Sequence, residues 1–124
     1  MELPRVLIVE DEPDNQAIVR AVVEEMVGAS AILAGDGLEA ISVATREVPD
    51  LVLLDLMLPR LDGYEVARRL RGDPQTSKIP IIAITALARP KDRARALEAG
   101  CDDYVDKPFD LDLLERKIRG KLTK

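Results

Sequence analysis

Short apolar runs alternate along the chain with longer segments in which apolar residues recur at helical spacing. Two of these runs, residues 6–9 and 51–54, are apolar at every position, which is typical of parallel strands that helices cover on both faces. Three weaker runs continue the series. The five predicted strands are residues 6–9, 31–34, 51–54, 80–84 and 103–105.

Helix signals fill the segments between the predicted strands. The first predicted helix begins at Pro13 and ends at Gly28, and the fourth begins at Pro90 and ends at Gly100. Proline suits the first turn of a helix and glycine its C-terminal end, so each of these pairs marks a complete helix.

Capping residues predict the other three helices. The second opens with Asp36 and Glu39 and the third with Asp62 and Glu65, and this Asp-x-x-Glu spacing is a variant of the capping box. The third helix ends near Gly72. The fifth is expected to have its own aspartate cap and a hydrophobic staple, formed by Asp110, Phe109 and Leu114.

The alternation of strands and helices with short connections predicts a (βα)5 arrangement. Right-handed crossovers between parallel strands leave few topologies, and we expect a doubly wound α/β sheet with five parallel strands. Neither a linker nor a low-complexity tract interrupts the pattern, so residues 1–124 are expected to form a single domain.

Composition and charge narrow the range of functions. The chain has 18 basic and 23 acidic residues, and phosphate groups repel such an acidic chain, so neither nucleic acid nor a membrane is expected as a direct partner. The chain has no histidine, which excludes hydrolase triads of the usual type and histidine-bearing zinc sites. The single cysteine, Cys101, cannot form an internal disulfide, and no apolar run is long enough for a signal peptide or a membrane span. We therefore expect a cytoplasmic protein.

Polar residues follow four of the predicted strands at the end where each strand finishes. These ends meet at one edge of a parallel sheet, which is where ligands bind in doubly wound folds. Taken singly, each residue has an ordinary structural explanation, such as a solvated acidic turn or a surface lysine. Their joint placement is harder to attribute to chance. The residues are Glu10, Asp11, Glu12, Asp55, Thr85 and Lys107.

The charges at this edge predict a cation site. Glu10, Asp11 and Asp55 are three carboxylates facing the single ammonium of Lys107, an imbalance that a bound cation would relieve. Oxygen ligands suit Mg²⁺. With Mg²⁺ bound, an incoming phosphoryl group would no longer be repelled, and Asp55 could act as a nucleophile that forms an acyl phosphate. Thr85 and Lys107 are suited to hold the phosphoryl oxygens.

Six sequence blocks, in order, resemble those of response regulator receiver domains and cover essentially the whole chain. One of them is Asp-Lys-Pro-Phe at residues 106–109. The resemblance implies a flavodoxin-like fold with strand order 2-1-3-4-5. It also implies a two-component phosphoacceptor that receives a phosphoryl group from a histidine kinase or a histidine phosphotransfer protein. The blocks are residues 6–13, 49–59, 62–65, 81–86, 99–104 and 106–109.

The resemblance implies a role for each residue of the metal site. Asp55 corresponds to the phosphorylated aspartate, Asp11 to a direct Mg²⁺ ligand, and Glu10 to an acid that acts mainly through metal-bound water. The backbone carbonyl of Met57 would supply a further ligand. Glutamate at position 10 is a common variant in the family and changes none of these expectations.

The resemblance also implies a switch. Thr85 corresponds to the hydroxyl residue that moves toward the phosphoryl group, and Lys107 to its cationic partner, with a cis peptide bond before Pro108. Tyr104 corresponds to an aromatic residue that turns toward the core when Thr85 moves. The alternative is that Tyr104 only covers the edge of the sheet.

Two apolar residues bear on the lifetime of the acyl phosphate. Met57 lies two residues after Asp55 and Leu87 two residues after Thr85, at positions that influence this lifetime in the family. Neither side chain can orient an attacking water molecule. We therefore expect slow self-dephosphorylation, over minutes or longer.

Basic residues gather on the fourth predicted helix, and two interpretations are open. They form either an ordinary solvated helix face or part of a face built from helix 4, strand 5 and helix 5, as in receivers of the winged-helix transcription-factor subfamily. The second interpretation predicts a phosphorylation-dependent homodimer whose salt bridges are sensitive to salt. Its residues are Arg93, Arg95, Asp102, Asp103 and Arg116.

Rival functions fit less well. A phosphatase of the haloacid dehalogenase type would carry a second aspartate two residues after its nucleophile, where this chain has Met57. An FMN-binding flavodoxin would need hydroxyl and glycine residues where Glu10 and its neighbours would repel a phosphate. Because every site residue is present, a degenerate receiver used only for interaction is excluded. Whether the chain acts alone on a downstream protein target or belongs to a longer regulator or hybrid kinase stays open.

Overall fold

The computed structural model, which describes residues 2–86 and 89–122, contains a five-stranded sheet in the order β2-β1-β3-β4-β5. All neighbouring strands pair in parallel. This confirms the predicted doubly wound α/β fold and its strand order. The strands are β1 (Arg5–Val9), β2 (Ser30–Ala34), β3 (Leu51–Asp55), β4 (Ile81–Thr85) and β5 (Asp103–Asp106).

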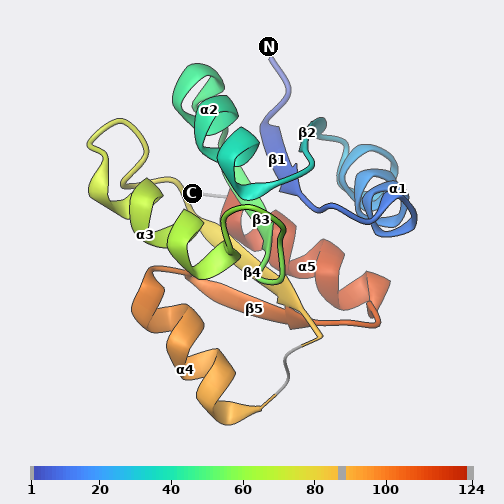
Figure 1. Ribbon diagram of the computed structural model, residues 1–124. Helices are drawn as coiled ribbons and strands as arrows, with labels where there is room; N and C mark the ends of the chain where they lie inside the picture. Colours follow the sequence, from blue (N-terminus) through green and yellow to red (C-terminus); the bar gives the residue numbers. More distant parts are fainter. Residues whose placement is uncertain (1, 87–88, 123–124) are drawn as a thin grey trace.

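Helices cover both faces of the sheet. Figure 1 shows α1 and α5 on one side of the sheet and α2, α3 and α4 on the other. Each helix lies between the two strands that it connects or follows the last strand, as the alternating pattern predicts. The helices are α1 (Pro13–Ala21), its continuation η1 (Val22–Val27), α2 (Gly37–Glu47), α3 (Gly63–Gly72), α4 (Pro90–Ala99) and α5 (Leu111–Leu122).

The first predicted helix has the expected ends but changes its winding. It is α-helical to Ala21 and continues as a π-helix from Val22 to Val27. Gly28 then ends it with a left-handed backbone (φ 80°), and its N–H donates to the carbonyl of Val23. Val22 and Val23, the first two residues of the π-helix, are both buried in the core, and the local pattern does not reveal the change of winding.

The predicted capping boxes form only in part. Asp36 and Asp62 accept the N–H groups of Glu39 and Glu65 at 2.8 and 3.0 Å. The reciprocal bonds differ from the expected ones, because Glu39 accepts the N–H of Gly35 and Glu65 pairs with arginines of its own helix. The aspartates alone therefore start these two helices.

The start of the last helix agrees with the prediction. Asp110 accepts the N–H of Leu113 at 3.1 Å. Phe109 packs against the buried cluster that contains Leu114. Phe109 thus anchors the loop that leads from β5 into α5.

The core consists of two aliphatic layers, one on each face of the sheet. Leu7 and Val9 pack with residues of α2, α3 and α4, whereas Val6 and Ile8 pack with α1, η1 and α5. Successive side chains of a strand point to opposite faces, so a central strand with two covered faces must be apolar throughout. This explains the uninterrupted apolar runs in β1 and β3.

The single cysteine belongs to this core, and its environment predicts low reactivity. Burial raises the pKa of the Cys101 thiol to about 12, and its side chain is almost inaccessible. Because the thiolate is the reactive form, iodoacetamide at pH 8 is expected to alkylate the native protein far more slowly than the urea-unfolded protein. Mass spectrometry of timed samples measures both rates. Equally fast labelling of the native protein would contradict the prediction.

Candidate functional site

Three carboxylates meet where β1 and β3 end side by side. The ligand oxygens of Glu10, Asp11 and Asp55 all lie within 4.8 Å of one another. Glu10 and Asp55 are buried, whereas Asp11 is exposed. The predicted cluster therefore forms, and one of its members faces solvent.

Lys107 connects two of these carboxylates. Its ammonium donates to Glu10 Oε1 at 2.8 Å and to Asp55 Oδ2 at 3.0 Å. The peptide bond between Lys107 and Pro108 is cis, as expected. A lysine from the loop after β5 thus reaches the ends of β1 and β3.

The charges in the cluster are not balanced. Burial would lower the pKa of Lys107, but its hydrogen bonds to Glu10 and Asp55 outweigh burial, so this pKa lies above its usual value. Burial raises the pKa of Glu10 despite the hydrogen bond from Lys107, and the charge of Asp55 adds to the rise. One ammonium therefore does not compensate the carboxylates, and an excess of negative charge attracts a cation.

Backbone groups hold the carboxylates in place. Met57 N–H donates to Asp55 Oδ1 at 3.0 Å, which leaves Oδ2 to Lys107. Glu12 N–H donates to Glu10 Oε2 at 3.0 Å. Both oxygens of Asp55 therefore have a defined partner, and the side chain of Met57 stays 58% exposed beside them.

Two positions that the sequence analysis missed support the site. The Gln16 side-chain amide donates to the carbonyl of Glu10 at 2.5 Å. A Cβ on Gly63 would lie 2.5 Å from the carbonyl oxygen of Asp55, so only glycine allows α3 to begin this close to β3. The Asp-Gly pair at the start of the helix was a signal for Gly63, whereas Gln16 had no local signal.

Thr85 and Tyr104 occupy neighbouring strands. Thr85 ends β4, is fully buried, and accepts Lys107 N–H through its backbone carbonyl at 2.9 Å. Tyr104 pairs in register with Ala83. Its hydroxyl is buried and has no hydrogen-bond partner among the described residues, and burial raises its pKa. Thr85 thus lies at the cluster's edge of the sheet and Tyr104 two residues before the end of β5, while Leu87 lies outside the described residues.

A family model described as the response regulator receiver domain matches residues 6–119. The chain belongs to the response regulator receiver family. It is therefore a phosphoacceptor signalling domain of the two-component type rather than a classical enzyme, and its cluster of Glu10, Asp11 and Asp55 fits a Mg²⁺ site. Response regulators receive phosphoryl groups from histidine kinases and act on downstream targets.

Individual relatives agree with this assignment. The receiver domain is 38% identical over 122 residues to the DNA-binding dual master transcriptional regulator RpaA of Synechocystis, covering 98% of this chain and 50% of that protein. It is 45% identical over 123 residues to the probable transcriptional regulator ycf27 of Guillardia theta, covering 97% of this chain and 46% of that protein. The chain thus spans about half the length of these relatives.

A solved structure is similar in both sequence and fold. The receiver domain of a sensor histidine kinase from Pseudomonas aeruginosa is 37% identical, with a TM-score of 0.88 and 98% of each chain covered. That structure has a magnesium ion coordinated in its active site cleft.

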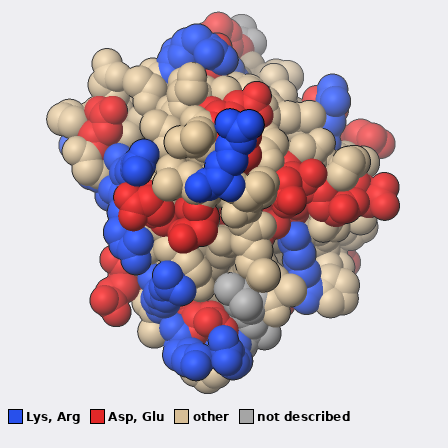
Figure 2. Space-filling view, viewed as in Figure 1, with Lys and Arg blue, Asp and Glu red and all other residues tan. Residues whose placement is uncertain are grey.

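The predicted interface residues are engaged within the receiver domain itself. Asp103 pairs with Lys117, Asp102 with Arg71, and Arg93 with Asp106. Arg116 donates to a backbone carbonyl of its own helix, and Arg95 lies over a tyrosine ring. Figure 2 shows basic side chains gathered over α4. A homodimer through this face stays a prediction.

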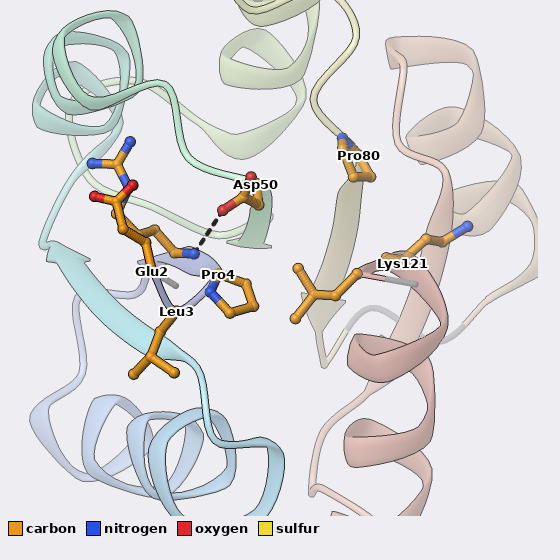
Figure 3. A pocket seen from close by; sticks show the side chains of 8 residues that line it. Glu2, Leu3, Pro4, Asp50, Pro80 and Lys121 are labelled. Atoms are coloured by element: carbon orange, nitrogen blue, oxygen red, sulfur yellow. Dashed lines mark hydrogen bonds between the residues drawn. The ribbon is translucent and has the colours of Figure 1, made fainter. Parts of the chain in front are cut away.

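A cavity lies at the edge of the sheet opposite to the acidic cluster, where the strands begin. It measures about 550 Å³ and is bordered by the N-terminal segment, Asp50, Pro80 and the end of α5 (Figure 3). Asp50 Oδ2 accepts Arg5 N–H there at 2.7 Å. None of its lining residues belongs to the acidic cluster.

Among the described helices, none has the length and apolar character needed to cross a membrane.

Proposed function

We propose that the receiver domain accepts a phosphoryl group on Asp55 from a histidine kinase or a histidine phosphotransfer protein, in a reaction that depends on Mg²⁺. The observation that supports this most strongly is the convergence of Glu10, Asp11 and Asp55, with the ammonium of Lys107 bonded to two of them. This arrangement combines a nucleophile, a cation site and a positive group for the phosphoryl oxygens.

The donor set is suited to Mg²⁺ because it consists of oxygen atoms and one of its members, Asp11, is open to solvent. Mg²⁺ usually binds one or two carboxylates and keeps several water molecules. Glu10, Asp11, Asp55 and the backbone carbonyl of Met57 would hold the ion. When bound, Mg²⁺ would neutralise the carboxylates and the charge that develops on the phosphoryl oxygens.

The chain's own residues would then carry out the transfer. A carboxylate oxygen of Asp55 attacks phosphorus, and the bond between phosphorus and the donor's histidine nitrogen breaks, with its electron pair leaving on the imidazole. Lys107 already contacts Asp55 Oδ2 and exchanges this contact for one with a phosphoryl oxygen. The hydroxyl of Thr85 donates to another phosphoryl oxygen.

Phosphorylation would change the face formed by α4, β5 and α5. Movement of Thr85 toward the phosphoryl group alters the space next to Tyr104, whose hydroxyl is buried without a partner among the described residues. Such a group gains stability in any arrangement that supplies a hydrogen bond. A modest free-energy difference is enough to shift a two-state element. The shifted face would bind a downstream protein or a second receiver domain.

An apolar cavity beside the site is a suitable contact surface for the phosphodonor protein. It measures about 320 Å³, and its lining includes Ile18 and Phe109 together with Lys107. Ile18 is 41% exposed and Leu111 43% exposed, so the cavity presents apolar surface to solvent. Because Lys107 borders both the cavity and the acidic cluster, a helix that docks here would carry its phosphohistidine toward Asp55.

Labelling with a small phosphodonor tests the proposed function. Incubation with radiolabelled acetyl phosphate and Mg²⁺ is expected to yield labelled protein, because the chemistry requires only a phosphoryl group and the site itself. Removal of Mg²⁺ with EDTA is expected to prevent labelling, since the uncompensated carboxylates would repel the donor. Labelling that proceeds equally well in EDTA would contradict the proposal.

The phosphorylated protein is expected to lose its label over minutes or longer. Met57 is exposed at the site but apolar, so it cannot orient a water molecule for attack on the acyl phosphate. The label remaining on protein transferred to buffer without donor measures the lifetime. Met57→Asn is expected to shorten the lifetime several-fold by offering a polar group to water. Loss of the label from the unaltered protein within seconds would disprove the prediction.

A further inference from the structure

Arg95 differs from the other arginines of the described chain in its lack of polar partners. Each of the other described arginines contacts a carboxylate or a backbone carbonyl, but within residues 2–86 and 89–122 Arg95 has neither an ion pair nor a hydrogen bond. Its guanidinium carbon instead lies 3.9 Å from the centroid of the Tyr64 ring. The N–H groups of Arg95 are therefore available to a ligand.

Tyr64 provides a fixed platform for this guanidinium. The tyrosine is only 3% exposed and belongs to the core layer beneath α3 and α4. Stacking on a ring uses the flat face of a guanidinium and leaves its edge, with the N–H groups, directed outward. Arg95 is thus held in place without losing its capacity to bind an oxyanion.

The position of Arg95 relates it to the phosphoacceptor site. A cleft of about 470 Å³ is lined by Asp11 and Met57 next to the acidic cluster, by Tyr64 at the start of α3 and by Arg95 of α4. Asp62 also lines the cleft, but its carboxylate accepts the N–H of Glu65 at the start of α3. Among the residues that line this cleft, Arg95 therefore supplies the positive charge, and Asp11 is the member of the acidic cluster that it faces.

We propose that Arg95 binds the phosphoryl group of the incoming phosphodonor in this cleft before its transfer to Asp55. A phosphoryl group carries negative charge and planar sets of oxygens that match a guanidinium edge. The acidic cluster attracts a cation but disfavours an anion, so a positive group across the cleft increases the local concentration of the donor. This inference rests on the proposed phosphorylation of Asp55 and assigns the binding step that precedes it.

A comparison of two arginines on the same helix tests the proposal. Arg93 also lies over a tyrosine ring, at 4.9 Å from the centroid, but it pairs with Asp106 and does not line the cleft. The rate of labelling is measured over a series of acetyl phosphate concentrations for Arg95→Met, Arg95→Lys and Arg93→Met. Binding of Mg²⁺ to each variant is measured separately by calorimetry.

Arg95→Met is expected to lower the second-order rate constant of labelling about tenfold, as for loss of a charge-assisted hydrogen bond. Arg95→Lys keeps the positive charge, so its rate constant of labelling should fall less than that of Arg95→Met. Arg93→Met should be labelled at nearly the normal rate. Mg²⁺ affinity should be unchanged in all three variants. Normal labelling of Arg95→Met, or an equal loss in Arg93→Met, would overturn the proposal. Failure of the unaltered protein to be labelled would instead refute the proposed function itself.

The phosphoryl group can come from a small molecule or from a phosphohistidine. The same rates are therefore measured with acetyl phosphate and with a phosphorylated histidine phosphotransfer protein. A defect of Arg95→Met with both donors is the expected result, because both present the same group to the cleft. A defect with the phosphoprotein alone would overturn the proposal and assign Arg95 to a protein contact.

Discussion

Asp55→Asn is expected to abolish Mg²⁺-dependent labelling and to leave a folded protein. An amide oxygen is a far weaker nucleophile than a carboxylate and cannot form the acyl phosphate. In the unaltered protein, Met57 N–H donates to Asp55 Oδ1 at 3.0 Å. Asparagine has nearly the same shape as aspartate, and its amide oxygen can accept the same bond. Labelling is followed by autoradiography and folding by circular dichroism.

The same variant is expected to be more stable than the unaltered protein in EDTA. Asp55 and Glu10 share the single ammonium of Lys107, and the charge of Asp55 contributes to the raised pKa of Glu10. Removing one of two buried like charges should therefore raise the free energy of unfolding of the metal-free protein. Urea unfolding at pH 7 in EDTA measures the difference.

Asp50→Asn is the matched control for this substitution. Asp50 lies immediately before β3, at the opposite edge of the sheet, and accepts Arg5 N–H at 2.7 Å. An amide oxygen can accept the same bond, so labelling should be unchanged. Labelling that persists in Asp55→Asn would show that Asp55 is not the phosphoacceptor. Loss of labelling in Asp50→Asn as well would show that the effect of Asp55→Asn does not identify the acceptor.

Gly63→Ala is expected to destabilise the protein by about 3 kcal/mol and to slow labelling. The added Cβ would lie 2.5 Å from both the Asp55 carbonyl oxygen and the Leu56 Cα, and neither backbone atom can move aside without shifting the end of β3. Overpacking of this kind typically costs about 1–3 kcal/mol and occasionally more. Because Asp55 and Met57 lie in the displaced segment, their positions at the site would change with it.

Gly120→Ala shows what the same substitution does without a steric conflict. Gly120 is exposed within α5, and nothing lies within 4 Å of a Cβ at this position. Alanine there should stabilise the protein by about 0.5–1 kcal/mol, because glycine loses more backbone entropy in a helix. Urea unfolding and labelling are measured on both variants. A Gly63→Ala protein with normal stability would refute the close packing of α3 on β3.

The correct predictions from sequence concern features that neighbouring residues determine. Apolar runs located the strands because a central strand buries both faces. The aspartates at positions 36, 62 and 110 marked helix starts because each bonds an N–H three residues further on. The acidic cluster followed from the same pattern, since residues at the ends of parallel strands share one edge.

Features that depend on distant contacts were not predictable in this way. The first helix ends at Gly28 as expected, but its apolar spacing did not indicate the π-helical winding from Val22 to Val27. The bonds that Asp102 makes within the domain are a further example, because its carboxylate accepts N–H groups of Arg71 and of Ile81. These partners lie more than twenty residues away in the chain, so no local pattern signals them.

By itself, the sequence determined the strands, the helix starts, the strand order through its family resemblance, and the set of residues at the phosphoacceptor edge. Only the tertiary structure decided how these residues share their bonds: Lys107 with both Glu10 and Asp55, Gln16 with the carbonyl of Glu10, and Arg95 with the ring of Tyr64. The physical reason is that hydrophobic periodicity and capping act over a few residues. The partner of a charged side chain is set by the packing of segments that the fold brings together.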